Sequence, residues 1–220
     1  MTDAATAREL LVGARVLAAH GLVDAFGHVS ARVDGARALI TPARPLGTLA
    51  DPAELLELPL DAQDLPAGVP REAWIHLALY RADPAVGAVC RAQPPSTLAA
   101  GAVASALPAL HGQGALVGAA VPVFDDARLV RDAPRGGAVA ARRGEAGAIV
   151  LRGNGAVTVG ASVGDAVARM VLLERMARVY LAARAAGGGA EPPPLRAEEA
   201  AAWAAAAPEL LARLWAHLSA

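Results

Sequence analysis

The sequence predicts an α/β fold in which a mixed or antiparallel sheet lies between layers of helices. Two turn signals indicate hairpins, Asp34-Gly35 and Gly153-Asn154-Gly155, because such pairs favour the left-handed backbone of tight turns. Apolar residues recur at helical spacing in the segments around these hairpins. Hairpins and helices therefore alternate along 220 residues, a length that fits one substantial core.

Local sequence signals support the predicted helices and strands. Leu10, Leu11 and Leu17 share one face of a first helix, and Pro70 suits the start of a later one, with Glu72 in its first turn. Ser162 is placed to cap a long helix. In chain order, the expected helices are 5–20, 70–81, 94–104, 162–186 and 197–218, and the expected strands are 26–33, 36–41, 55–60, 86–90, 120–124, 147–151 and 156–159.

The same pattern divides the chain into a main domain and a C-terminal helix. The domain is expected over 1–186, followed by a Gly- and Pro-rich linker over 187–196. The last segment, 197–220, carries Trp203, Leu211 and Trp215 in a helical pattern. We expect this helix to pack on the domain or on a neighbouring subunit.

Charge and cysteine content limit the possible partners. The net charge is −1 with no basic patch, so neither nucleic acid nor an anionic membrane surface is expected as a partner. No apolar run reaches the roughly 18 residues of a membrane span. Residues 1–5 lack the features of a secretory signal, and the single cysteine, Cys90, cannot form an internal disulfide. These features indicate a cytoplasmic protein.

The chain contains no lysine, since all 20 of its basic residues are arginine. Schiff-base aldolase chemistry and pyridoxal phosphate both need a lysine amine. A Walker-type phosphate loop needs its lysine as well. The sequence therefore excludes all three.

Several ordered blocks over about residues 8–185 resemble the class II aldolase/adducin family. They are Gly27-His28-Val29-Ser30-Ala31-Arg32, Leu39-Ile40-Thr41-Pro42, the helix of Glu72, 86–95, 151–156 and 163–180. The resemblance implies a three-layer α/β/α domain that forms homo-oligomers, with tetramers favoured and pockets between subunits. His28, together with 111–114 and 121–125, looks most similar to family members that decarboxylate small carboxylates.

The resemblance also implies a divalent metal, usually zinc, held by three histidines. Here the three corresponding positions are Arg91, Gln93 and Asn154. A guanidinium is always protonated and offers no lone pair, and neutral amides are weak ligands for zinc. We therefore expect no metal and no other cofactor.

Three interpretations of Arg91 remain open. Its guanidinium could replace the metal as the electrophile that stabilises an enolate or binds a carboxylate. It could instead form only a structural salt bridge with Glu72 in a site that has lost catalysis. It could also point to a subunit interface.

The sequence favours an enzyme, a carbon–carbon lyase of aldolase or decarboxylase type acting on a small hydroxy- or keto-carboxylate. Glu72 would be the acid/base and Arg91 the electrophile. The expected substrate-binding residues are Gly27, His28, Ser30, Thr41, Arg71, Gln93, His111 and Asn154. His76 is expected to be a core histidine bonded to backbone, and Cys90 to be buried and inert. The alternative is a catalytically inactive, adducin-like homologue with a binding or structural role.

Overall fold

An eight-stranded sheet forms the centre of the computed structural model, which describes residues 3–220. The strand order is β3-β2-β1-β4-β8-β7-β6-β5, and every neighbouring pair is antiparallel except β6 and β7. The strands are β1 (His28–Arg32), β2 (Arg37–Ile40), β3 (Leu56–Pro59), β4 (Ala88–Ala92), β5 (Ala106–Pro108), β6 (Ala120–Phe124), β7 (Ala148–Leu151) and β8 (Gly155–Gly160). The predicted mixed sheet with two hairpins is confirmed.

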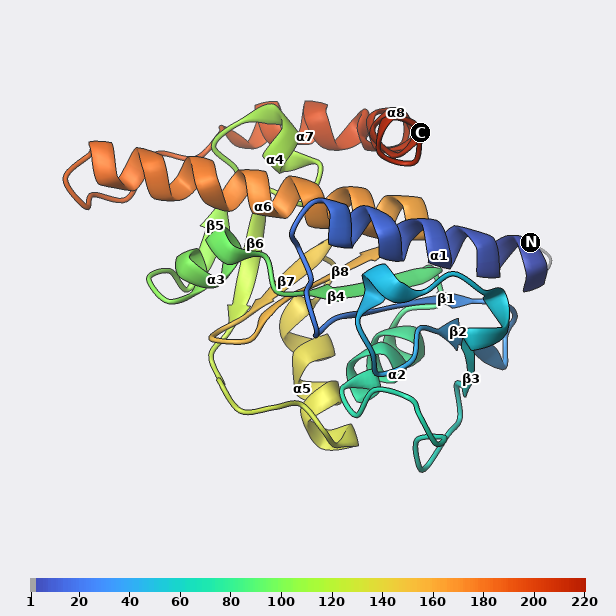
Figure 1. Ribbon diagram of the computed structural model, residues 1–220. Coiled ribbons are helices and arrows are strands. Elements are labelled where there is room, and N and C mark those ends of the chain that lie inside the picture. The colour runs from blue at the N-terminus through green and yellow to red at the C-terminus, as the bar shows by residue number, and fades with distance from the viewer. Residues whose placement is uncertain (1–2) are drawn as a thin grey trace.

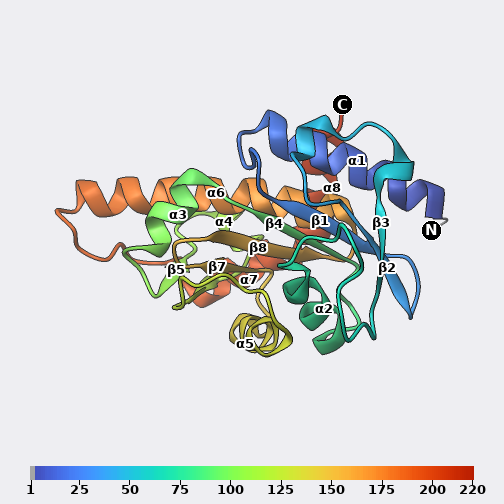
Figure 2. The same ribbon diagram turned by 60° about the horizontal axis from the view of Figure 1, so that its bottom comes forward.

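Helices cover both faces of this sheet (Figures 1 and 2). On one face lie α1 (Asp3–Ala19), α3 (Pro95–Gly101) and α6 (Val163–Ala186). On the other face lie α2 (Ala73–Ala82) and α5 (Ala133–Arg143). The three-layer α/β/α architecture is therefore confirmed. Outside α6 there is a further partial layer, formed by α4 (Gly112–Ala115), α7 (Ala197–Ala205) and α8 (Ala207–Leu218) (Figure 1).

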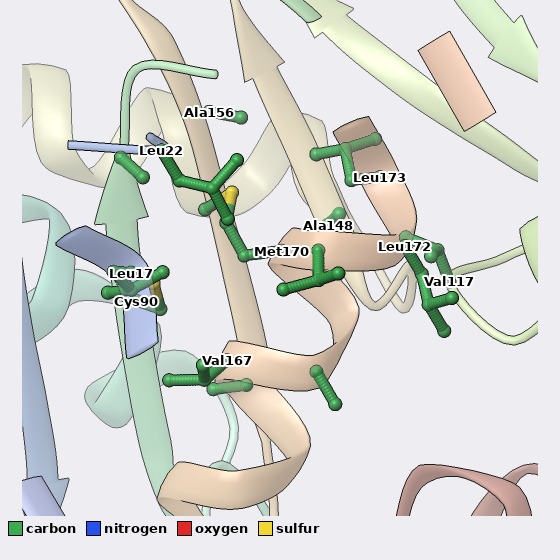
Figure 3. Close-up of a cluster of buried hydrophobic side chains, with 14 of the residues drawn as sticks. Leu17, Leu22, Cys90, Val117, Ala148, Ala156, Val167, Met170, Leu172 and Leu173 are labelled. Carbon is green, nitrogen blue, oxygen red and sulfur yellow. The ribbon is translucent and has the colours of Figure 1, made fainter. Parts of the chain in front are cut away.

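Each face of the sheet buries its own apolar cluster. The cluster on the α6 face includes Leu17 of α1, Cys90 of β4, and Val167 and Met170 of α6 (Figure 3). The cluster on the α2 face is smaller and includes Val89 of β4, the residue next to Cys90. Neighbouring strand residues point to opposite faces, so β4 contributes to both clusters and lies at the centre of the fold.

Helix α6 also supplies the cap of a second helix. Pro94 at the start of α3 has no side chain able to accept a hydrogen bond. The buried carboxylate of Glu174 takes that role, accepting from the backbone N–H groups of Ser96 and Thr97 at 3.0 and 2.9 Å. As predicted, the Ser162 hydroxyl accepts from the Asp165 N–H and caps α6 itself.

Several predicted boundaries were wrong. The C-terminal segment forms two helices, because Pro208 lies in the first turn of α8, where its missing N–H and fixed φ start a helix but prevent one from continuing. Glu72 lies at the N-cap of α2, one residue before the helix, and α3 ends at Gly101. The sequence analysis missed α4, α5 and β5; Val139 is the one large apolar side chain among the buried residues of α5, the others being Gly136, Ala140 and Arg143.

The C-terminal pair of helices packs on the main body through α6 and α4. Leu211 of α8 is buried in the α6-side cluster, and Trp203 of α7 lies against Gly112 of α4. Among residues 3–220, none of the helices combines the length and apolar character that crossing a bilayer requires.

Candidate functional site

The central strand β4 places Arg91 and His28 side by side. His28 of β1 and Arg91 of β4 are directly paired residues in an antiparallel ladder, so their side chains emerge on the same face of the sheet. That face is the one covered by α2, whose N-terminal end carries Glu72. The three side chains therefore converge although they are far apart in the sequence.

The tight turn between β7 and β8 brings Asn154 to the same place. Gly153 and Gly155 on either side of it have φ values of +70° and +92°, a region that disfavours residues with a side chain. A Cβ at Gly155 would lie 2.1 Å from the carbonyl oxygen of Ala92. The two glycines thus let the turn approach the end of β4, where Arg91 lies.

One nitrogen of Arg91 joins these residues. Its Nη2 donates to the side-chain and main-chain oxygens of Asn154 at 2.6 and 3.1 Å, and to Glu72 Oε1 at 3.4 Å. Asn154 Nδ2 donates to the same Glu72 oxygen at 3.4 Å, and Gln93 Nε2 reaches Asn154 Oδ1 at 3.5 Å. Arg91 is only 2% exposed, so this cation is fixed and largely removed from water. It can stabilise negative charge that develops beside Glu72.

The surroundings keep Glu72 ionised. Burial by itself would raise the pKa of Glu72, but the neighbouring His28 and the positive charge of Arg91 outweigh it and lower this pKa to about 2. His28 Nε2 lies 4.0 Å from Glu72 Oε2. Glu72 in the free protein is therefore a carboxylate at neutral pH, which makes it a proton acceptor at the start of a reaction.

Four buried side chains, beginning with His28, form a hydrogen-bonded chain that leads away from Glu72. His28 Nδ1 lies 2.7 Å from His76 Nε2, and His76 Nδ1 lies 2.6 Å from Ser30 Oγ. Ser30 Oγ in turn lies 2.7 Å from the Tyr80 hydroxyl. Burial lowers the pKa of His28, and lowers that of His76 to well below its usual range, so both rings are neutral at pH 7. The prediction that His76 bonds to backbone was wrong, since both of its nitrogens bond to side chains.

Comparison with known proteins identifies the family. Residues 8–181 match the family model described as "Class II Aldolase and Adducin N-terminal domain". The chain belongs to this family.

Two curated relatives in the class II aldolase family are decarboxylases. They are the 3,4-dihydroxyphthalate decarboxylases of Rhodococcus jostii (strain RHA1), 32% identical over 206 residues, and of Terrabacter sp. (strain DBF63), 32% identical over 197 residues. Each alignment covers 82% of this chain and 82% of the relative. The resemblance of the sequence to decarboxylase-type members of the class II aldolase family agrees with these matches.

Solved structures show the same fold. The L-fuculose-1-phosphate aldolase of Thermus thermophilus is 28% identical, with a TM-score of 0.75 over 83% of this chain and 96% of that one. An aldolase II superfamily protein of Pseudomonas syringae is 23% identical, with a TM-score of 0.79 over 97% of this chain and 90% of that one. The fold that this chain shares with these structures covers 83% of it in the first case and 97% in the second.

Of the substrate-binding residues predicted from the class II aldolase resemblance, some lie in the cluster. His28, Gln93 and Asn154 do, and Gly27 lies at its edge, where a Cβ would be 3.3 Å from the Arg91 carbonyl oxygen. Ser30 lies behind His28 and is connected to it through His76, so it does not contact Glu72.

The other predicted residues lie elsewhere. Thr41 is buried, and its hydroxyl accepts from the Val29 N–H, which ties β1 to the end of β2. Arg71 is exposed and lines a separate surface cleft of about 580 Å³ with Trp74. His111 caps α4 on the far side of α6, beside Met176. Within one subunit these three side chains do not reach the Glu72–Arg91 cluster.

Two further observations complete the site. Cys90 is fully buried, as predicted, and burial raises the pKa of its thiol to about 12, which agrees with the expectation of an inert thiol. Tyr80 was missed by the sequence analysis. Its position four residues after His76 and eight after Glu72 places all three on one helix face, and that spacing could have found it.

Proposed function

We propose that this protein is a carbon–carbon lyase that decarboxylates a small hydroxylated carboxylate, with Arg91 in place of the family's divalent metal. The observation that carries the proposal is the joint placement of Glu72 and Arg91 around Asn154 at the end of β4. An ionised carboxylate beside a buried guanidinium supplies a base and a site for negative charge. The two decarboxylase relatives support the reaction type.

The residues in this cluster fit a divalent metal poorly. Arg91 is a cation without a lone pair, and its Nη2 already donates to Asn154 Oδ1, the oxygen that a metal would need. Within residues 3–220, no three His, Cys, Asp or Glu side chains are grouped so that they could hold a metal ion. We therefore derive no step through a metal.

In the proposed reaction the substrate carboxylate lies against Arg91 and its hydroxyl against Glu72. Glu72 accepts the hydroxyl proton, and the oxyanion so formed is stabilised by the guanidinium and by the amide of Gln93. The oxyanion then becomes a C=O group while the neighbouring carbon, which bears the carboxylate, takes the proton back from Glu72. The bond to the carboxylate carbon breaks, CO₂ leaves, and the bonding pair moves onto the oxygen, which becomes an oxyanion again beside the guanidinium. A proton from water restores the hydroxyl, so each CO₂ released consumes one proton.

Because both relatives are named 3,4-dihydroxyphthalate decarboxylase, 3,4-dihydroxyphthalate is the first substrate to test for this chain. Its adjacent hydroxyl and carboxylate groups offer the two functions that Glu72 and Arg91 would bind. A panel should include it, phthalate without hydroxyl groups, and a catechol without carboxylates. We expect CO₂ release from hydroxylated carboxylates alone.

The assay should use protein treated with a chelator and checked by elemental analysis. We expect turnover to persist after chelation and to fall at least about 100-fold in Glu72→Gln and in Arg91→Met. Turnover that depends on added zinc, manganese or iron would refute the metal-free mechanism. No turnover of any hydroxylated carboxylate, by folded protein, would instead support the inactive, adducin-like alternative.

We also propose that the functional form is a homo-oligomer, with a tetramer favoured. Phe26 is 65% exposed although it lies two residues before His28, and a neighbouring subunit that covered it would remove this apolar side chain from water. Light scattering coupled to gel filtration measures this directly, and Phe26→Asp is expected to weaken the assembly; a monomer in solution would contradict the proposal.

A further inference from the structure

The hydrogen-bonded chain behind His28 has two possible directions. The two directions differ in which atom of each hydrogen bond carries the proton. They therefore also differ in which ring nitrogen of the neutral His28 is protonated. The distances alone, 2.6 to 2.7 Å, are compatible with both directions. The two ends of the chain decide between them.

At the Tyr80 end, only one direction satisfies the hydroxyl. Tyr80 is 3% exposed, and within residues 3–220 its O–H has no acceptor other than Ser30 Oγ. If Ser30 donated to Tyr80, the phenol proton would be buried without a partner, which is unfavourable. Tyr80 must therefore donate to Ser30, and Ser30 then donates to His76 Nδ1.

At the other end, the charge of Glu72 favours the same direction. His76 with Nδ1 as acceptor carries its proton on Nε2 and donates it to His28 Nδ1. The proton of His28 is then on Nε2, which faces the Glu72 carboxylate at 4.0 Å. The opposite direction would turn a nitrogen lone pair toward that negative charge.

We propose that Tyr80, Ser30 and His76 form a one-way chain that keeps the proton of His28 on Nε2, so that His28 presents an N–H donor to an anionic oxygen of the bound substrate. Within residues 3–220, His28 Nε2 is a buried nitrogen with no hydrogen-bond partner, although His28 is only 2% exposed. A substrate carboxylate or phenolate oxygen would satisfy it. His28 then contacts substrate, and the other three are positioning residues.

The nature of the acceptor rests on the proposed function, but the direction of the chain does not. It can be measured without any substrate by nitrogen NMR of protein labelled with ¹⁵N-histidine, because protonated and unprotonated ring nitrogens differ in chemical shift. The chain has five histidines, and His28→Asn assigns the signals of His28. We expect an unprotonated Nδ1 and a protonated Nε2 at pH 7. The reverse pattern would overturn the proposal.

Two matched pairs of variants test the origin of the direction. Ser30→Ala removes the donor to His76 Nδ1 and should give a mixture of both His28 tautomers, whereas Ser219→Ala, at an exposed hydroxyl bonded to the Trp215 carbonyl, should leave the spectrum unchanged. His76→Gln keeps a donor amide and an acceptor oxygen, so it should preserve the Nε2–H form, whereas His76→Leu removes the donor to His28 Nδ1 and should reduce the share of that form. An unaltered His28 tautomer in both Ser30→Ala and His76→Leu would show that the chain does not set it.

Where turnover has been established, Ser30→Ala should lower kcat/KM about tenfold, the equivalent of one hydrogen bond to a charged group. His76→Gln should retain most of it. If the protein proves inactive, the NMR experiment still tests the direction of the chain, because it needs no substrate. The CO₂ assay tests the proposed function and the NMR spectrum tests this inference, so the failure of one is separate from the failure of the other.

Discussion

Arg91 holds Asn154 through both of its oxygens, the side-chain Oδ1 at 2.6 Å and the main-chain O at 3.1 Å. The first contact depends on the amide side chain and the second on the path of the β7–β8 turn. A strand residue is thereby tied to a turn 63 positions later in the chain. The guanidinium cannot change its orientation without releasing this turn.

Replacing Arg91 should cost stability as well as activity. Arg91→Ala leaves Glu72 partly buried without its cation and opens a cavity, so we expect a loss of about 3–5 kcal/mol in the free energy of unfolding. Stability alone therefore cannot separate a catalytic from a structural Arg91, and a double-mutant cycle is needed. The double variant should lose about 1–3 kcal/mol less unfolding free energy than the sum of the losses of the two single variants.

Urea unfolding measures all four proteins of this cycle. The control is Arg178→Ala, because Arg178 pairs with Glu174 from a side chain that is 67% exposed, and its loss should stay within about 0.5 kcal/mol. Strict additivity of Arg91→Ala and Glu72→Gln would contradict the coupling.

The low pKa of Glu72 predicts a pH dependence of stability. Its folded-state pKa of about 2 lies below the ordinary value of 4.5, so Glu72 binds fewer protons in the folded state. The resulting contribution, at most about 3 kcal/mol, is fully present above pH 4.5 and is lost as the pH falls toward 2. The stability difference between the wild type and Glu72→Gln, from urea unfolding at pH 7, 4.5 and 3, should shrink along this series. A constant difference would mean that Glu72 has an ordinary pKa.

Ser30 should matter for stability because it connects two buried polar side chains. Ser30→Ala removes the acceptor of the Tyr80 O–H and the donor to His76 Nδ1, which costs about 2–4 kcal/mol. Thermal unfolding should show a lower Tm. Ser219→Ala is the matched control, since that exposed hydroxyl donates only to the Trp215 carbonyl and its loss should be nearly neutral. Equal effects of the two changes would argue against the buried chain.

Gly155 should not tolerate a side chain. Gly155→Ala combines a strained φ of +92° with a Cβ 2.1 Å from the Ala92 oxygen, so we expect a loss of at least about 2 kcal/mol and a displaced Asn154. Gly137→Ala is the contrast, because that helical glycine of α5 has open space around it, and alanine should stabilise the helix by about 0.5–1 kcal/mol. Chemical denaturation of both proteins tests the pair. A neutral Gly155→Ala would show that the turn can move.

Much of the fold could be predicted because its signals are local. Asp34-Gly35 and Gly153-Asn154-Gly155 specify hairpins within a few residues, and Ser162 marks the start of α6. The missed helix α5 has the same kind of local signal, since Asp132 caps its start, a proline lies in its first turn and Gly144 follows its end, but these signals were not used. The break at Pro208 was visible in the sequence but was not used.

The residues of the candidate site could be named from the sequence: the glutamate, the arginine and the two amides in family order, with no lysine to offer other chemistry. Their proximity was already implied by the resemblance. The folded structure was needed to show how they bond, that Thr41, Arg71 and His111 lie apart, and that His76 joins Ser30 and Tyr80. The direction of a hydrogen bond between β1 and α2 depends on burial and on which donors lack another acceptor, and neither is a property of any local stretch of sequence.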